Sequence, residues 1–353
     1  MFAILNVFQS LMLLNSEFFF CNFKPWKKIH VYDPNQICKT ISNFMKKNIL
    51  LFLTCSILIG FAACKKDSSN NNNNSDNQLA TQSDDQEQVS GEVDAVANDA
   101  DVALESSSSF TGRFNGAQGV ICDADVAVNT SGDPKTITIT YNGTNCLGNR
   151  KRTGVVVISM PANTQWKNQG AAITVTFQNL KITRVRDNKS VTINGTQTYT
   201  NVSGGLLINL ATLGSITHSI TSSGLTITFD NGTQRSWQVA KQRVFSFTQT
   251  GVVITTTGTH TDGNTTGIAE WGTNRFGGAF TTSILEPMVV RQDCDFRLTS
   301  GKVKHTVGNT SATATFGLNS AGEPTSCPGS GTYYFKAVWT GANGNSVTVI
   351  WPY

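Results

Sequence analysis

The chain has 353 residues and carries 27 Lys and Arg against 23 Asp and Glu, a net charge of +4. The basic excess forms no dense stripe, which excludes a typical nucleic-acid-binding protein. No metal-ligand spacing, phosphate loop or nucleophile elbow occurs in the sequence, so we expect neither a metal nor a cofactor.

Residues 1–44 show no clear periodicity and include an apolar Phe18–Phe20 run. A targeting segment normally stands at the N-terminus, so we interpret these residues as an upstream extension and place the true start at Met45. The alternative makes Phe2–Leu14 a first hydrophobic anchor.

Residues 45–63 have the features of a secretory signal peptide. Lys46 and Lys47 form a positive n-region, and residues 48–60 form an apolar h-region too short to span a bilayer. The segment ends at Cys64, which we predict to be lipidated. The mature protein would then be anchored in the membrane through this lipid.

Residues 64–109 are strongly acidic. Ten of the 23 acidic residues lie between Asp67 and Glu105, and no Lys or Arg follows Lys66 in this segment. Low hydrophobicity and one sign of charge predict a disordered tether that spans roughly 35–40 Å. Residues 110–353 carry 19 Lys and Arg against 11 Asp and Glu, so the acidic segment could also fold back on them.

Residues 110–353 form the folded body. Apolar residues alternate with threonines, as at Ile137, Ile139 and Tyr141, which is typical of half-buried antiparallel strands. Asn-Gly and Asp-Gly turns between these runs favour hairpins in series. We predict an all-β domain: a single large antiparallel meander of about 14 strands, either a β-sandwich or a curled, twisted sheet. At most one short helix is expected, over residues 204–214.

Four cysteines lie in the body, an even number that suggests two disulfides in an exported domain. The register of the hairpins brings Cys122 near Cys146, and Cys294 near Cys327. We therefore predict these two pairs. The absence of a Cys-x-x-Cys motif argues against a redox or metal role.

Candidate site residues are few. Glu270, beside Trp271 in a Gly- and Asn-rich stretch that we expect to be a loop, is the most site-like carboxylate. Trp166 and Trp271 lie in predicted loops and are the better candidates for ligand contact, whereas Trp237, Trp339 and Trp351 fall in phase with core-facing residues. The histidines His218, His260 and His305 are expected to occupy exposed polar positions. No catalytic residue is assigned.

The N-terminal signals resemble those of bacterial lipoproteins of the Bacteroidetes type. Phe61–Cys64 is similar to a lipobox, and Lys65, Lys66 and Asp67 resemble the export signal that follows the lipidated cysteine. The resemblance implies an outer-membrane lipoprotein with its body in the periplasm or displayed on the cell surface.

These observations favour a non-catalytic binding or structural domain that contacts a glycan or a protein partner. One alternative is a polysaccharide hydrolase with Glu270 as a carboxylate. Another is a carrier of lipid or of another apolar ligand, which requires a curled sheet around an apolar interior.

Overall fold

The computed structural model describes residues 73–112, 121–146, 148–185, 187–327 and 331–352, all within one compact unit. The predicted signal peptide, the lipidation site Cys64 and the upstream extension 1–44 lie outside the described residues. The helices are α3 (Asn73–Ser106), α4 (Ser108–Thr111), η3 (Leu207–Asn209), α5 (Leu210–Leu213) and η4 (Gln292–Cys294). None of these described helices has the length and apolar character needed to cross a membrane.

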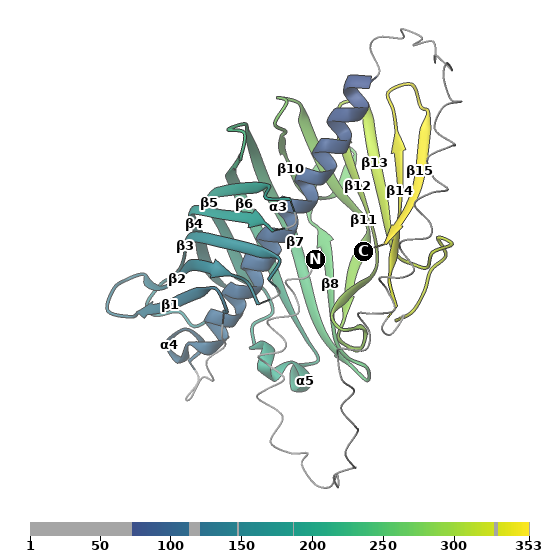
Figure 1. Cartoon of the computed structure of the whole chain (residues 1–353). Helices are drawn as coiled ribbons and strands as arrows, with labels where there is room; N and C mark the ends of the chain where they lie inside the picture. The colour runs from purple at the N-terminus through teal and green to yellow at the C-terminus, as the bar shows by residue number, and fades with distance from the viewer. Residues whose placement is uncertain (1–72, 113–120, 147, 186, 328–330, 353) are drawn as a thin grey trace, which may run out of the picture. The chain divides into compact units, whose positions relative to one another are not determined.

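Fifteen strands form one antiparallel sheet, which confirms the predicted all-β meander (Figure 1). The strands are β1 (Ala124–Asn129), β2 (Lys135–Thr144), β3 (Arg150–Met160), β4 (Ala171–Arg184), β5 (Ser190–Asn201), β6 (Ser215–Phe229), β7 (Gln234–Thr248), β8 (Gly251–Gly258), β9 (His260–Asp262), β10 (Thr265–Thr273), β11 (Ala279–Arg291), β12 (Arg297–Val307), β13 (Thr310–Leu318), β14 (Tyr334–Thr340) and β15 (Ser346–Pro352). Neighbours in sequence are neighbours in space from β1 to β7 and from β10 to β15.

Two short strands, β8 and β10, fill the space between the long strands β7 and β11. The first half of β7 pairs with β10 and its second half pairs with β8, and both short strands also pair with β11. The backbones of β8 and β10 approach each other closely here, because a Cβ atom on Gly258 would clash with the carbonyl oxygen of Gly267. Glycine is therefore required at position 258.

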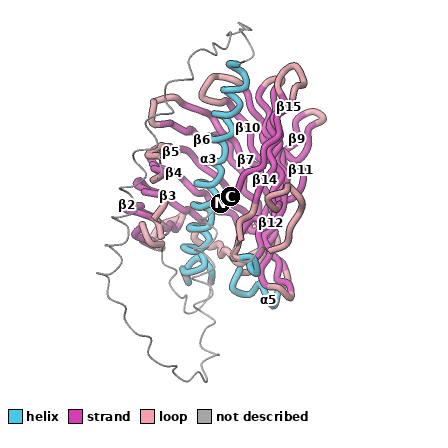
Figure 2. The backbone as a smooth tube through the Cα atoms, turned by 45° about the vertical axis from the view of Figure 1, so that its right-hand side comes forward, coloured by secondary structure: helices cyan, strands magenta, loops and turns pink. Residues whose placement is uncertain are grey.

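Helix α3 lies along one face of the sheet, which curls around it (Figure 2). The residues of the helix that are most buried and apolar recur every three or four positions, the spacing of one helical face. They are Val89, Val93, Val96, Ala97, Ala100 and Leu104, and they join the core cluster of the sheet. We call the sheet face that packs against α3 the inner face.

The pairing of polar residues shows how far the sheet wraps around the helix. Glu92 contacts Arg150 of β3, whereas Asp94 contacts Lys241 of β7. Residues two apart on a helix point to nearly opposite sides. Both sides of α3 are therefore enclosed by strands of the same sheet, which makes it a curled sheet rather than a sandwich.

The prediction of a disordered tether over residues 64–109 is wrong for residues 73–106, which form α3, and for residues 108–109, which lie in α4. The composition of the segment alone does not support a packed core, but the inner face supplies both apolar contacts and basic partners. For the same reason, the expectation of at most one short helix fails. The short helix expected over 204–214 is present as η3 and α5.

Both predicted disulfides are confirmed. Cys122 pairs with Cys146 and Cys294 pairs with Cys327, with Cα atoms 5.3 and 5.1 Å apart. The first bridge ties the segment before β1 to the turn between β2 and β3, and the second ties η4 to the segment before β14.

Candidate functional site

The inner face holds α3 through a series of ion pairs. Acidic residues along the helix meet basic residues from strands β3, β4 and β7 and from the turn after β10. The pairs are Glu92–Arg150, Asp99–Arg152, Asp84–Arg184, Asp94–Lys241, Asp101–Arg243 and Asp85–Arg275. The acidic segment and the basic body are thus electrostatically complementary, residue by residue.

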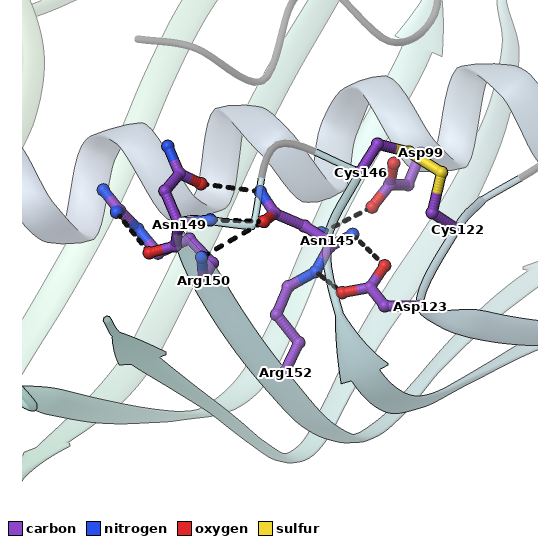
Figure 3. The surroundings of a disulfide bond; sticks show 8 residues. All are labelled: Asp99, Cys122, Asp123, Asn145, Cys146, Asn149, Arg150 and Arg152. Atoms are coloured by element: carbon purple, nitrogen blue, oxygen red, sulfur yellow. Dashed lines mark hydrogen bonds and ion pairs between the residues drawn. A yellow bond between two sulfur atoms is a disulfide. The ribbon is translucent and has the colours of Figure 1, made fainter. Parts of the chain in front are cut away.

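Arg152 is the centre of a buried cluster in this interface (Figure 3). Its Nε and Nη2 atoms donate hydrogen bonds of 2.6 Å to the two carboxylate oxygens of Asp123, and Nη1 donates one of 2.6 Å to Asp99. The Tyr141 hydroxyl donates a further hydrogen bond to Asp99 at 2.9 Å. Since Asp123 follows the disulfide-bonded Cys122, one arginine joins α3, β3 and the first disulfide.

His218 and Asp101 form a second buried group. His218 Nδ1 lies 3.8 Å from Asp101, and Arg243 lies 4.0 Å from the other oxygen of the same carboxylate. Burial, with a contribution from the charge of Arg243, lowers the pKa of His218 to about 3. Burial raises the pKa of Asp101 to about 6, although Arg243 opposes that shift. The expectation that His218 is an exposed polar residue is therefore wrong.

Glu270 is a structural anchor and not an accessible carboxylate. Its residue is 1% exposed, it pairs with Lys241 at 2.6 Å, and it accepts a hydrogen bond of 2.7 Å from Ser90 of α3. The expected loop at this position is instead strand β10, followed by a tight turn. The interpretation of Glu270 as a ligand-binding or hydrolytic residue is thus wrong, because its charge is neutralised inside the α3 interface.

The two tryptophans predicted to contact a ligand differ in their surroundings. Trp166 lies in the connection between β3 and β4 but is only 1% exposed, and it packs edge-on against His218 at 5.1 Å. Its assignment to a ligand surface is therefore wrong. Trp271 is half-buried on β10, with its ring stacked on that of His260 at 4.0 Å. His260 already covers one face of this ring.

An apolar surface occupies the inner face at the end of the sheet. Register pairs place Glu270, Thr282, His305, Ala312, Trp339 and Val347 side by side across six strands. Directly opposed residues of antiparallel strands point to the same face, so β13–β15 continue the face that carries α3. Apart from the buried Thr310 at the start of β13, the inner-facing residues of these three strands include nine apolar side chains: Ala312, Ala314, Phe316, Phe335, Ala337, Trp339, Val347, Val349 and Trp351. We call them the C-terminal apolar face.

The aromatic rings of the C-terminal apolar face contact one another. Trp351 lies edge-on to Trp339 at 5.7 Å and to Phe335 at 6.2 Å between centroids. Despite these contacts, Trp351 is 50% exposed and Val347 is 62% exposed. The assignment of Trp351 to the core is therefore wrong, whereas Trp237 is fully buried as predicted.

The potential metal ligands near the second disulfide are already engaged. Among the described residues, Asp293, Cys294 and Cys327 bring three ligand-type atoms close together. The two sulfur atoms are bonded to each other, and Asp293 pairs with Arg291. With no free thiolate, this group offers a metal only one carboxylate.

The most extensive of these features is the interface between α3 and the sheet, and the sequence carries one signal for it. Val89, Val93, Val96, Ala100 and Leu104 follow helical spacing, which would have indicated that the acidic segment forms a helix with one apolar face. For the C-terminal apolar face, alternation correctly placed Trp339 and Trp351 on one side of their strands but did not reveal how much of that side is covered. No protein family, curated protein or solved structure matches the chain.

Proposed function

We propose that this protein is a non-catalytic binding module, anchored to the bacterial outer membrane through Cys64, that holds a protein partner on its C-terminal apolar face. The observation that carries the proposal is the exposure of Trp351 and Val347 within a continuous apolar surface. Exposed apolar patches mark interaction sites, and tryptophan is enriched at the centres of protein interfaces.

The chemistry of this face favours an apolar contact over a sugar. All nine of its residues are apolar, so their side chains offer no hydroxyl, amide or charged group to recognise a sugar. An aromatic cluster that buries a partner's side chains gains its free energy from the area removed from water. A protein partner therefore fits better than the glycan that the sequence also suggested.

The position of α3 changes the expected geometry of the anchor. The helix begins at Asn73, only nine residues after Cys64. A chain of nine residues spans at most about 32 Å. If Cys64 is lipidated, the start of α3 would lie at most about 32 Å from the anchored cysteine, whereas a disordered tether over residues 64–109 would permit a larger separation.

Replacement of Cys64 by Ala tests the anchor. We expect the variant to retain its signal peptide and to carry no lipid, because the acyl chains are attached to this sulfur. Intact mass and membrane fractionation measure both effects. Cys55→Ala, a change within the predicted h-region, is the control and should mature normally. Normal lipidation of Cys64→Ala would contradict the proposed anchor.

A photo-crosslinking amino acid in place of Val347 tests the binding face in living cells. We expect one discrete protein adduct, because this position is exposed on the proposed binding face. The adduct should be lost when Trp351→Ala is added, since the ring supplies the largest contact area. Mass spectrometry would identify the adduct.

The same amino acid at Leu213, an exposed apolar position on α5, is the matched control and should not give the same adduct. If positions 347 and 213 give the same adducts, or if Trp351→Ala leaves the adduct unchanged, the C-terminal apolar face is not the binding site. Labelling of position 347 by a fatty-acid probe alone would instead favour the second candidate, a carrier of apolar ligands.

A further inference from the structure

Arg235 on β7 differs from the paired arginines that hold α3. It is 2% exposed, and its guanidinium carbon lies 4.2 Å from the centroid of the Phe280 ring. Its Nη2 atom donates a hydrogen bond to the neutral side chain of Gln86. Among the described residues, no carboxylate lies within ion-pair distance of Arg235, whereas such a partner exists for Arg150, Arg152, Arg184, Arg243 and Arg275.

Several buried hydrogen-bond donors near Arg235 have no acceptor. They are Nε and Nη1 of Arg235, Nε1 of Trp237 and Nδ2 of Asn274. Arg235 and Trp237 are two residues apart on β7 and so share the inner face. Asn274 directly follows Thr273, the last residue of β10, which pairs with Ser236, so it lies at the level of Arg235 where the turn after β10 begins.

The orientation of the Asn274 amide is fixed by the turn after β10. Its Oδ1 atom accepts hydrogen bonds from the backbone N–H groups of Phe276 at 3.0 Å and of Gly278 at 2.9 Å. The oxygen is therefore occupied, and the unpartnered atom is the Nδ2 donor. These four unpartnered atoms are all donors, and the unpartnered acceptor Oε1 of Gln82 lies one turn before Gln86 on α3.

Among the described residues, the carboxylates nearest to Arg235 act on its charge only from a distance. The nearest acidic groups, Glu270 and Asp85, are held by Lys241 at 2.6 Å and by Arg275 at 2.5 Å. Burial lowers the pKa of Arg235 to about 10, and these two carboxylates offset the effect only in part. A buried cation that lacks a neutralising partner is strongly unfavourable.

We propose that a small anion, either an inorganic ion or a carboxylate, binds between α3 and the inner face at Arg235, Trp237 and Asn274. Buried donors are almost always satisfied, and an anion can accept from all of them while it neutralises the guanidinium. A water molecule surrounded by donors would leave its own hydrogen atoms without acceptors. This site is separate from the C-terminal apolar face and does not depend on the proposed function.

Thermal unfolding of the full chain tests this site. The protein is exchanged into sodium HEPES, whose sulfonate anion is bulky and is not a carboxylate, and is then titrated with chloride, acetate or inorganic phosphate at constant ionic strength. We expect at least one of these anions to raise the melting temperature in a saturable manner, by roughly 5 °C at 100 times its dissociation constant. Arg235→Gln should abolish the rise. Arg184→Gln, which alters a paired arginine on the same face, should retain it.

Two further measurements decide the question if Arg235→Gln does not fold. Trp237→Phe keeps the ring but removes one donor, so it should weaken the anion midpoint roughly fivefold. A crystal grown in bromide should show an anomalous peak within hydrogen-bond distance of Arg235 and Trp237. A melting temperature that is independent of the anion, an equal response in Arg235→Gln, an unchanged midpoint in Trp237→Phe, or ordered water in place of bromide would each overturn the proposal.

Discussion

Replacement of Arg152 by Met is expected to lower the free energy of unfolding by about 3–5 kcal/mol, because it leaves buried carboxylates without their cation. Arg152 neutralises Asp123 through two hydrogen bonds and Asp99 through a third, and its guanidinium lies 4.3 Å from the Tyr141 ring centroid. Denaturant unfolding at pH 7.5 measures the loss. Hydrogen exchange should show the earliest opening in the part of α3 around Asp99.

The dependence of this loss on pH separates a charge effect from a packing effect. Burial already raises the pKa of Asp99 with Arg152 present, and removal of the Arg152 charge would raise that pKa further. Protonation then relieves the unpaired charge as the pH falls, so the loss should be smaller at pH 4 than at pH 7.5. An equal loss at both values would indicate that only packing was removed.

Two other variants serve as controls for Arg152→Met. Lys302→Met breaks the exposed ion pair with Glu286, which is 3.0 Å long, and should cost less than about 1 kcal/mol. The triple variant Asp99→Asn, Asp123→Asn and Arg152→Met removes the whole charged group and should recover part of the lost stability. A triple variant as unstable as Arg152→Met would show that the unpaired carboxylates are not the cause.

Local patterns in the sequence were sufficient to predict the sheet. Alternation of period two, together with Asn-Gly and Asp-Gly turns, depends only on neighbouring residues, and it placed most strands correctly. The same hairpin registers gave the pairs Cys122–Cys146 and Cys294–Cys327. These features could be predicted because each is specified within a few tens of residues.

The acidic helix could not be predicted from composition, because its stability depends on distant residues. Taken alone, residues 73–106 have too little apolar surface to fold. Their partners, such as Arg150 of β3 and Lys241 of β7, lie far along the chain. The complementary charges of the two segments suggested an attraction, but only the curled sheet brings each acidic residue to a specific basic one.

The candidate site residues were misjudged for a related reason. The sequence presents Glu270 as the most site-like carboxylate, yet its partners Ser90 and Lys241 are contributed by α3 and β7. Alternation places a side chain on one face of a strand, but it does not report what covers that face. Trp166 is buried against residues distant in sequence, such as His218, whereas Trp351 is 50% exposed.

Replacement of Asp101 by Asn is expected to raise the free energy of unfolding at pH 7.5 by roughly 2–3 kcal/mol. The folded protein holds the Asp101 proton up to a pKa of about 6, whereas the unfolded chain releases it near the ordinary value of about 3.9. The folded state therefore binds more protons between these values, and the contribution of Asp101 to stability falls as the pH rises through this window. Asparagine resembles the protonated carboxyl, so the advantage of the variant should vanish near pH 4.

The comparison with wild type is essential here, because neighbouring groups titrate with the opposite sign. Burial lowers the pKa of His218 to about 3 and that of His305 to about 4, so both histidines reduce stability as the pH falls below about 6.5. These effects are common to both proteins and largely cancel in the difference. Asp262→Asn, at an exposed position of β9, is the matched control for the loss of an aspartate at the surface and should change the free energy of unfolding by less than about 0.5 kcal/mol. Destabilisation by Asp101→Asn at pH 7.5 would show instead that the ionised carboxylate is needed to neutralise Arg243, and that this ion pair outweighs the cost of burying the charge.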